Sequence, residues 1–159
     1  MVRRRKAGTV IEIVSPTTLP RAKEAGALVA GILQTLKSRT AVGTSLQDID
    51  RWTGAMIAKA GAVSCYVEYE PSFGRGPFGH YICTSVNDAV LHGLPADYPL
   101  ADGDLLSLDL AVASGGVVAD SAISFIVGDS QPAESVALIA ATERAARRDS
   151  RCPAWRAHR

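Results

Sequence analysis

Cysteines and long apolar runs are both scarce in this chain of 159 residues. No apolar stretch approaches the roughly 18 residues that a membrane-spanning helix needs, so the sequence predicts no such helix. Cys65, Cys83 and Cys152 are too few and too irregularly spaced for a disulfide framework or a zinc knuckle, and we expect free thiols. The basic start MVRRRK is not followed by the apolar core of a signal peptide. A cytoplasmic location is therefore the expectation.

The remaining composition is that of a globular domain, with 47% hydrophobic and 21% charged residues. A chain of this length can form one domain that buries roughly two thirds of its unfolded surface. Charge is unevenly spread, because ten of the seventeen basic residues lie in residues 3–6 and 144–159. We divide the chain into a basic tail (1–9), a domain (10–147) and an atypical basic tail (148–159). A solvated tail is the simpler interpretation of the first cluster, and phosphates of RNA or the ribosome are the alternative partner.

The stretch from Asp104 to Val127 predicts two strands joined by a tight turn. A loop of two residues (Ser114 and Gly115) or of four (113–116) gives one register, in which Asp109 directly faces Asp120. Alternation assigns one face to the core: Leu106, Leu108, Leu110, Val112, Val117, Ala119, Ile123, Phe125 and Val127. The opposite face collects small or polar residues, namely Ser107, Asp109, Ala111, Val118, Asp120, Ala122 and Ser124.

Two facing carboxylates with Cβ atoms roughly 5 Å apart repel one another, so a cation between them would stabilise the pair. Hard divalent ions suit this arrangement, because carboxylate oxygens are their preferred ligands. From spacing alone, a solvated turn with two exposed aspartates is an equally good interpretation.

The flanking segments predict helices that pack on this sheet. We expect a helix from Ser15-Pro16 to about Lys37, a second helix capped by Ser45, and a third over 132–147. Short extended segments are expected at 10–14, 62–68 and 80–87. His92 follows an apolar run just before the aspartate hairpin, and it is interpreted either as a structural residue or as an acid/base or substrate-binding group.

Three motifs in order, ICTSVNDAVLHGLP (82–95), GDLLSLDL with Asp109, and ADSAISFIVG with Asp120, resemble the type I methionine aminopeptidases. The resemblance covers residues 10 to 143 and implies the amino-terminal half of a pita-bread α/β (α+β) fold, in which helices pack on a curved antiparallel sheet. It implies a site for two divalent metal ions (Co, Mn, Fe or Zn) between two similar halves, and removal of the initiator methionine from nascent polypeptides.

The resemblance also implies roles for individual residues. Asp109 matches a ligand of one metal and Asp120 a ligand that bridges both. His92 matches the histidine that contacts the substrate and helps to stabilise the tetrahedral intermediate, while Cys83 and Phe78 match positions that line the methionine pocket. The family's remaining ligands, one histidine and two glutamates, match nothing in this chain.

We therefore expect the second half of the fold to be absent, metal binding to be weak, and the chain to be truncated and inactive alone. An exposed half-fold face predicts self-association. The alternative is a non-catalytic module of the same fold that binds peptides or the ribosome. A proline-specific or creatine-cleaving relative shares the paired aspartates, but the CTSVND and HGLP segments favour the methionine-specific branch.

Overall fold

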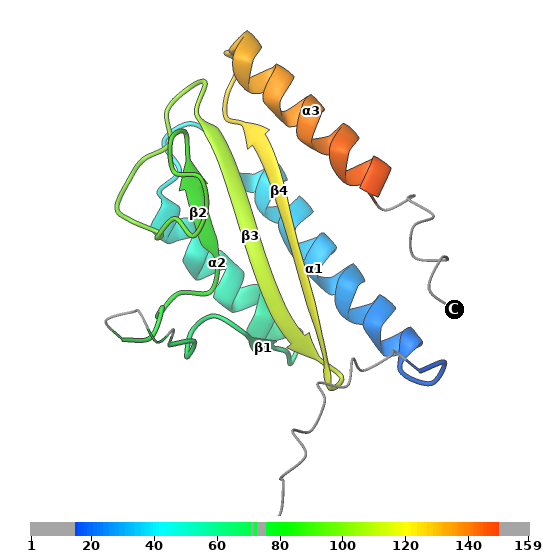
Figure 1. Cartoon of the computed structure of the whole chain (residues 1–159). Helices are drawn as coiled ribbons and strands as arrows, with labels where there is room; N and C mark the ends of the chain where they lie inside the picture. Colours follow the sequence, from blue (N-terminus) through cyan, green and yellow to red (C-terminus); the bar gives the residue numbers. More distant parts are fainter. Residues whose placement is uncertain (1–14, 71, 73–75, 150–159) are drawn as a thin grey trace, which may run out of the picture.

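An antiparallel sheet covered on one face by two helices forms the body of the computed structural model, which describes residues 15–149 except 71 and 73–75 (Figure 1). The elements in chain order are α1 (Leu19–Arg39), α2 (Leu46–Lys59), β1 (Val63–Ser64), β2 (Cys83–Val86), β3 (Leu105–Ser114), β4 (Val117–Ile126) and α3 (Ala133–Asp149). This confirms the predicted α/β class with helices on an antiparallel sheet. No helix within the described ranges is long and apolar enough to cross a membrane.

Strand β3 is the centre of the sheet. It pairs with β4 along one side, and with β2 and then β1 along the other. Its even-numbered leucines point towards α1 and α2 and are fully buried, whereas the side chains at the odd-numbered positions lie on the opposite face. The core therefore lies between this face and the helices, and its members are Val29, Ile32, Leu33, Leu36, Leu46, Ile49, Ile57, Ile82, Leu100, Leu106, Leu108, Leu110, Val112, Phe125 and Val127. The predicted division of the hairpin into two faces is correct.

The predicted register of the hairpin is wrong by two residues. The loop consists of Gly115 and Gly116, so that Ser114 pairs with Val117, Asp109 faces Ala122, and Asp120 faces Ala111. Both glycines have positive φ angles, 59° and 78°. A two-residue hairpin loop that matches the strand twist needs positive φ at both positions, which glycine adopts without the steric cost that Ser114 would incur. Because the error is an even number of residues, both aspartates stay on the same face.

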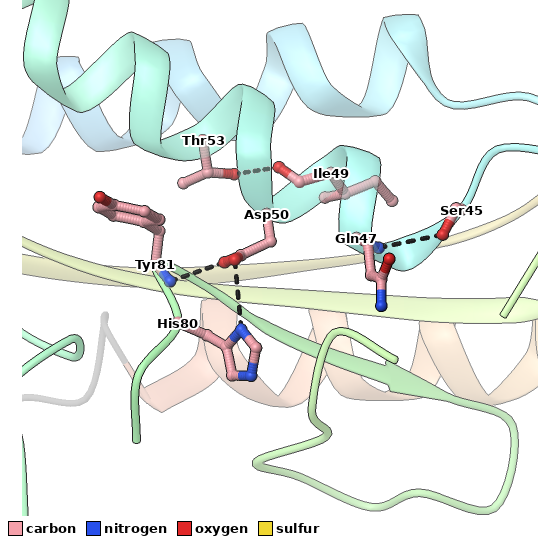
Figure 2. Close-up of polar contacts among 7 residues, drawn as sticks. All are labelled: Ser45, Gln47, Ile49, Asp50, Thr53, His80 and Tyr81. Atoms are coloured by element: carbon pink, nitrogen blue, oxygen red, sulfur yellow. Dashed lines mark hydrogen bonds and ion pairs between the residues drawn. The ribbon is translucent and has the colours of Figure 1, made fainter. Parts of the chain in front are cut away.

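Helix α2 begins as predicted, while α1 begins later. The Ser45 hydroxyl accepts the backbone N–H of Gln47 at 3.3 Å and caps α2 (Figure 2). The Ser15 carbonyl instead accepts the N–H groups of Thr18 and Leu19 in a turn, and the helix starts at Leu19 with a proline in its first turn. That position tolerates proline because its N–H would lack a helical partner anyway.

Two strands are shorter than predicted. The extended segment expected at 62–68 is a strand only at Val63–Ser64, because the chain turns at Tyr66, whose carbonyl accepts the N–H of Tyr69. The segment expected at 80–87 is a strand only over Cys83–Val86. The extended piece expected at 10–14 lies outside the described residues.

Two buried threonines provide a test of this packing. Thr84 on β2 is buried, and its hydroxyl has no hydrogen-bond partner among the described residues, whereas the buried Thr53 hydroxyl donates to the Ile49 carbonyl at 2.7 Å (Figure 2). We expect Thr84→Val to raise the free energy of unfolding by about 1 kcal/mol, because an unsatisfied buried hydroxyl is removed. Thr53→Val should lower it by about 1 kcal/mol. Urea denaturation measures both, and a destabilised Thr84→Val variant would contradict the packing described.

Candidate functional site

Asp109 on β3 and Asp120 on β4 share the face of the sheet that the helices leave open. They are diagonal rather than direct neighbours, since each faces an alanine of the other strand, and their side chains are close enough to interact. Asp120 is exposed. Partial burial and the neighbouring charge of Asp109 raise the pKa of the Asp120 carboxyl. The two carboxylates therefore interact electrostatically.

Tyr66 reaches Asp109 from the turn that follows β1. Its hydroxyl donates a hydrogen bond to Oδ1 of Asp109 at 3.1 Å. The backbone positions Tyr66 there because β1 pairs with the carboxyl-terminal end of β3. Just after β1, the Cys65 N–H donates to the Ala111 carbonyl of β3 at 3.1 Å. Burial, and then the charges of Asp109 and Asp120, raise the pKa of the Tyr66 phenol far above its usual range. Tyr66 is therefore a neutral donor at neutral pH.

Cys83 joins the same group from β2. It is buried and pairs directly with Asp109 across the sheet. Burial, followed by the charges of Asp109 and Asp120, raises the pKa of the Cys83 thiol to about 11. A thiol that stays protonated at neutral pH acts as an apolar wall more readily than as a nucleophile. Cys65 and Cys83 are both free thiols, as predicted, and Cys152 lies outside the described residues.

Phe78 lies next to Tyr66 and is supported in turn by His80. The Phe78 ring contacts the Tyr66 ring edge to face, with centroids 5.9 Å apart, and the His80 ring in the same manner at 5.6 Å. Asp50 on α2 anchors this segment: Oδ1 accepts the Tyr81 N–H at 2.7 Å, and Oδ2 lies 3.3 Å from Nδ1 of His80 (Figure 2). A carboxylate on the helix thus fixes the chain just after Phe78.

His92 lies near the outer edge of β2, in an unusual backbone conformation. Its φ angle is 55°, a left-handed conformation that non-glycine residues rarely adopt. The next residue, Gly93, is fixed against β2: its N–H donates to the Ser85 hydroxyl at 3.1 Å, and its carbonyl accepts the Thr84 N–H at 2.8 Å. A Cβ on Gly93 would meet the Thr84 carbonyl oxygen at 2.2 Å, so only glycine fits this approach. The His92 side chain is exposed, and no hydrogen bond joins it to the aspartates within the part of the chain described here.

The donor chemistry of this face fits a hard divalent cation in part. Two carboxylates offer oxygen ligands on one surface, and the repulsion between them is the kind that a bound cation relieves. No group of three His, Cys, Asp or Glu side chains within the described ranges is placed to hold a metal ion. Asp109 and Asp120 could thus supply a partial ligand set.

The structure brings together four of the five residues singled out from the sequence, directly or through one neighbour: Asp109, Asp120, Cys83 and Phe78. His92 lies beside β2, next to the hydrogen-bonded Gly93, and the described residues show no hydrogen bond from it to the other four. Tyr66, His80 and Asp50 were not anticipated. Nothing in the local sequence marks them, because Tyr66 reaches Asp109 across 43 positions and His80 reaches Asp50 across 30.

Comparisons with known proteins identify the family of this chain. The model of metallopeptidase family M24 matches residues 20–149. The chain is 33% identical over 134 residues to a methionine aminopeptidase of Helicobacter pylori, covering 84% of the chain and 50% of the relative. It is 37% identical over 117 residues to that of Clostridium perfringens, with coverages of 72% and 44%. The chain spans about half the length of the curated relatives it matches, and it corresponds to their amino-terminal half.

Solved structures give the same result for the fold. A methionine aminopeptidase of Rickettsia prowazekii superposes with a TM-score of 0.79 at 26% identity, over 86% of this chain and 52% of that one. A prolidase of Pyrococcus furiosus superposes with a TM-score of 0.66 at 14% identity, over 86% and 37%. The second likeness concerns the fold alone. Together they identify the sheet and its helices as half of a pita-bread fold.

The Gly93 contact yields a prediction. Gly93→Ala should lower the free energy of unfolding by about 1–3 kcal/mol, because the new methyl group would collide with the backbone of β2. Gly31→Ala, in α1 with open space around it, is the matched control and should be neutral or stabilising by up to about 1 kcal/mol. Thermal or urea unfolding measures both. Equal effects of the two substitutions would contradict the close packing of Gly93.

Proposed function

Because the chain belongs to metallopeptidase family M24, we propose that it carries the amino-terminal half of a methionyl aminopeptidase centre, which removes the initiator methionine from nascent polypeptides. The observation that supports this most directly is the pair of aspartates on adjacent strands of one hairpin, sharing the open face of the sheet. The curated relatives named above are methionine aminopeptidases, which favours this activity over that of the prolidases.

In this proposal Asp109 and Asp120 hold divalent metal ions. When bound, such ions supply an activated water and polarise the scissile carbonyl. The two aspartates are a partial ligand set, so the complete centre for two ions requires further ligands. Carboxylates accept Mn, Fe, Co and Zn, and the donor set does not select among them.

The other residues bind and orient the substrate. In this proposal Cys83, which pairs with Asp109, and Phe78, which contacts Tyr66, supply apolar surface for an unbranched side chain such as methionine. His92, held by Gly93 at the edge of β2, contacts the substrate and donates or accepts a proton at the reacting peptide group. The left-handed conformation of His92 supports such a role, since strained backbone is concentrated at functional sites.

The partners follow from this activity. Nascent chains that begin with methionine are the proposed substrates, and the ribosome is a proposed partner through the basic residues 3–6. These residues lie outside the described part of the chain. A non-catalytic module that only holds peptides is the second candidate, because the described residues supply an incomplete ligand set.

Metal binding tests the proposal. Titration calorimetry with Mn²⁺ should show weak binding to the wild-type chain, and Asp120→Asn should weaken it by more than about tenfold, since even outer-shell partners are worth roughly 10–100-fold in affinity. Asp97→Asn, which alters an exposed loop aspartate away from this face, is the control and should bind as the wild type does. Equal binding by Asp120→Asn, or none by the wild type, would overturn the metal site. Release of methionine from a Met-Gly peptide by the Mn²⁺-loaded chain alone would exclude the peptide-holding module.

We also propose self-association through the open face. Val63 and Val118 flank Ala113 in the sheet, and the two valines are 65% and 64% exposed. Val118→Asp should therefore lower the fraction of dimer in sedimentation velocity, because a charge would enter an apolar contact. Val136→Asp, on the exposed side of α3, is the control. A monomeric wild-type chain at high concentration would refute this contact.

A further inference from the structure

We propose that Tyr66 is a positioning residue for Asp109, and that Asp50 supports Tyr66 from helix α2 through His80 and Phe78. This inference deepens the proposed function and rests on it, since it concerns how one of the two proposed metal ligands is oriented. It assigns new roles to Tyr66, His80 and Asp50, and a further role to Phe78, all outside the ligand set.

The first contact is the hydrogen bond from the Tyr66 hydroxyl to Oδ1 of Asp109, at 3.1 Å. An aspartate side chain on a sheet face that is open to solvent rotates among several conformers. A donor at Oδ1 selects one of these conformers and leaves Oδ2 for a cation. Residues that hold metal ligands by hydrogen bonds affect metal affinity strongly, because an oriented ligand loses less conformational entropy on binding.

The second contact holds the tyrosine. Tyr66 is in a turn rather than a strand, so backbone pairing alone does not fix its ring. The Phe78 ring contacts it edge to face, and the backbone of this segment is closed by hydrogen bonds from Phe78 to the Tyr69 carbonyl (2.9 Å) and from Gly79 to the Val67 carbonyl (3.0 Å). Edge-to-face contacts of this kind stabilise one relative orientation of the two rings, in addition to the burial of their area.

The third contact connects this segment to the core. His80 contacts Phe78 edge to face. Asp50 on α2 binds both the His80 ring and the Tyr81 N–H (Figure 2). The Asp50 side chain is 16% exposed, so that its hydrogen bonds are partly shielded from water. Asp50 lies one residue after the fully buried Ile49, on a helix whose buried face is part of the core. The sequence of contacts from Asp50 to Asp109 therefore begins at a rigid element.

A single hydroxyl can be removed to test the first contact. Tyr66→Phe keeps the ring and its contact with Phe78 and deletes only the donor. We expect Mn²⁺ binding to weaken about tenfold, measured by titration calorimetry. Tyr98→Phe is a matched control, because it removes a tyrosine hydroxyl that donates to another aspartate, Asp104, at 2.9 Å, away from this face. Tyr98→Phe should leave Mn²⁺ affinity unchanged.

A measurement without metal separates this inference from the proposed function. Three-bond NMR couplings of the Asp109 β-protons report its χ1 angle. We expect one conformer in the wild-type chain and an average of conformers in Tyr66→Phe. Absence of Mn²⁺ binding by the wild-type chain would refute the proposed metal site but leave this prediction in force. An unchanged χ1 in Tyr66→Phe, or unchanged affinity in a chain that binds Mn²⁺, would overturn the positioning role.

The support from α2 is tested by coupling. Asp50→Ala should also average the Asp109 χ1 angle, and the double variant Asp50→Ala/Tyr66→Phe should bind Mn²⁺ no more weakly than Tyr66→Phe alone, because both changes remove the same constraint. Asp48→Ala, on the same helix and paired with Arg51, is the control. Additive losses in the double variant, or an unchanged Asp109 χ1 in Asp50→Ala, would overturn the role of Asp50. Urea unfolding of each variant confirms that the comparison is between folded chains.

Discussion

Burial of one face of β3 against helices α1 and α2 is the constraint on which the rest of the structure depends. The leucines at 106, 108 and 110 are completely inaccessible to solvent, and because side chains of a strand alternate, the intervening positions must face the other way. Asp109 is one of these positions. Its place on the open face is thus a consequence of core packing, and β4 follows because it pairs with β3 along its whole length.

Much of the fold could be predicted from the sequence, because it depends on local periodicity. The alternation of 104–127 gave the correct faces, and Ser45 gave the start of α2. The predicted register was wrong because it depends on which two residues form the turn. Both turn positions need a positive φ angle, which favours Gly115 and Gly116 over Ser114 and Gly115. The strand at 62–68 was overestimated because the turn at Tyr66 after β1 has no strong sequence signal.

The candidate site also contains residues that the sequence predicts and residues that it does not. The aspartates and Cys83 are in strands, where periodicity and pairing determine which residues meet. Tyr66, Phe78, His80 and Asp50 meet through loops and through a helix distant in sequence, and no local pattern encodes such contacts. His92 is intermediate: its motif identified it, whereas its left-handed backbone and the close approach of Gly93 are visible only in three dimensions. The motif thus identifies His92 as a candidate residue, and the structure shows how its backbone is held.

The two-glycine turn also restricts how this hairpin can change during evolution. Insertion or deletion of one residue in the turn would shift the pairing of β4 by one position and exchange its two faces. Asp120 would then enter the core, and Phe125, now 7% exposed, would turn towards solvent. A change of two residues would preserve both faces and alter only the offset between the aspartates. Turn lengths among functional relatives should therefore differ from this one by even numbers, unless a bulge in one strand compensates.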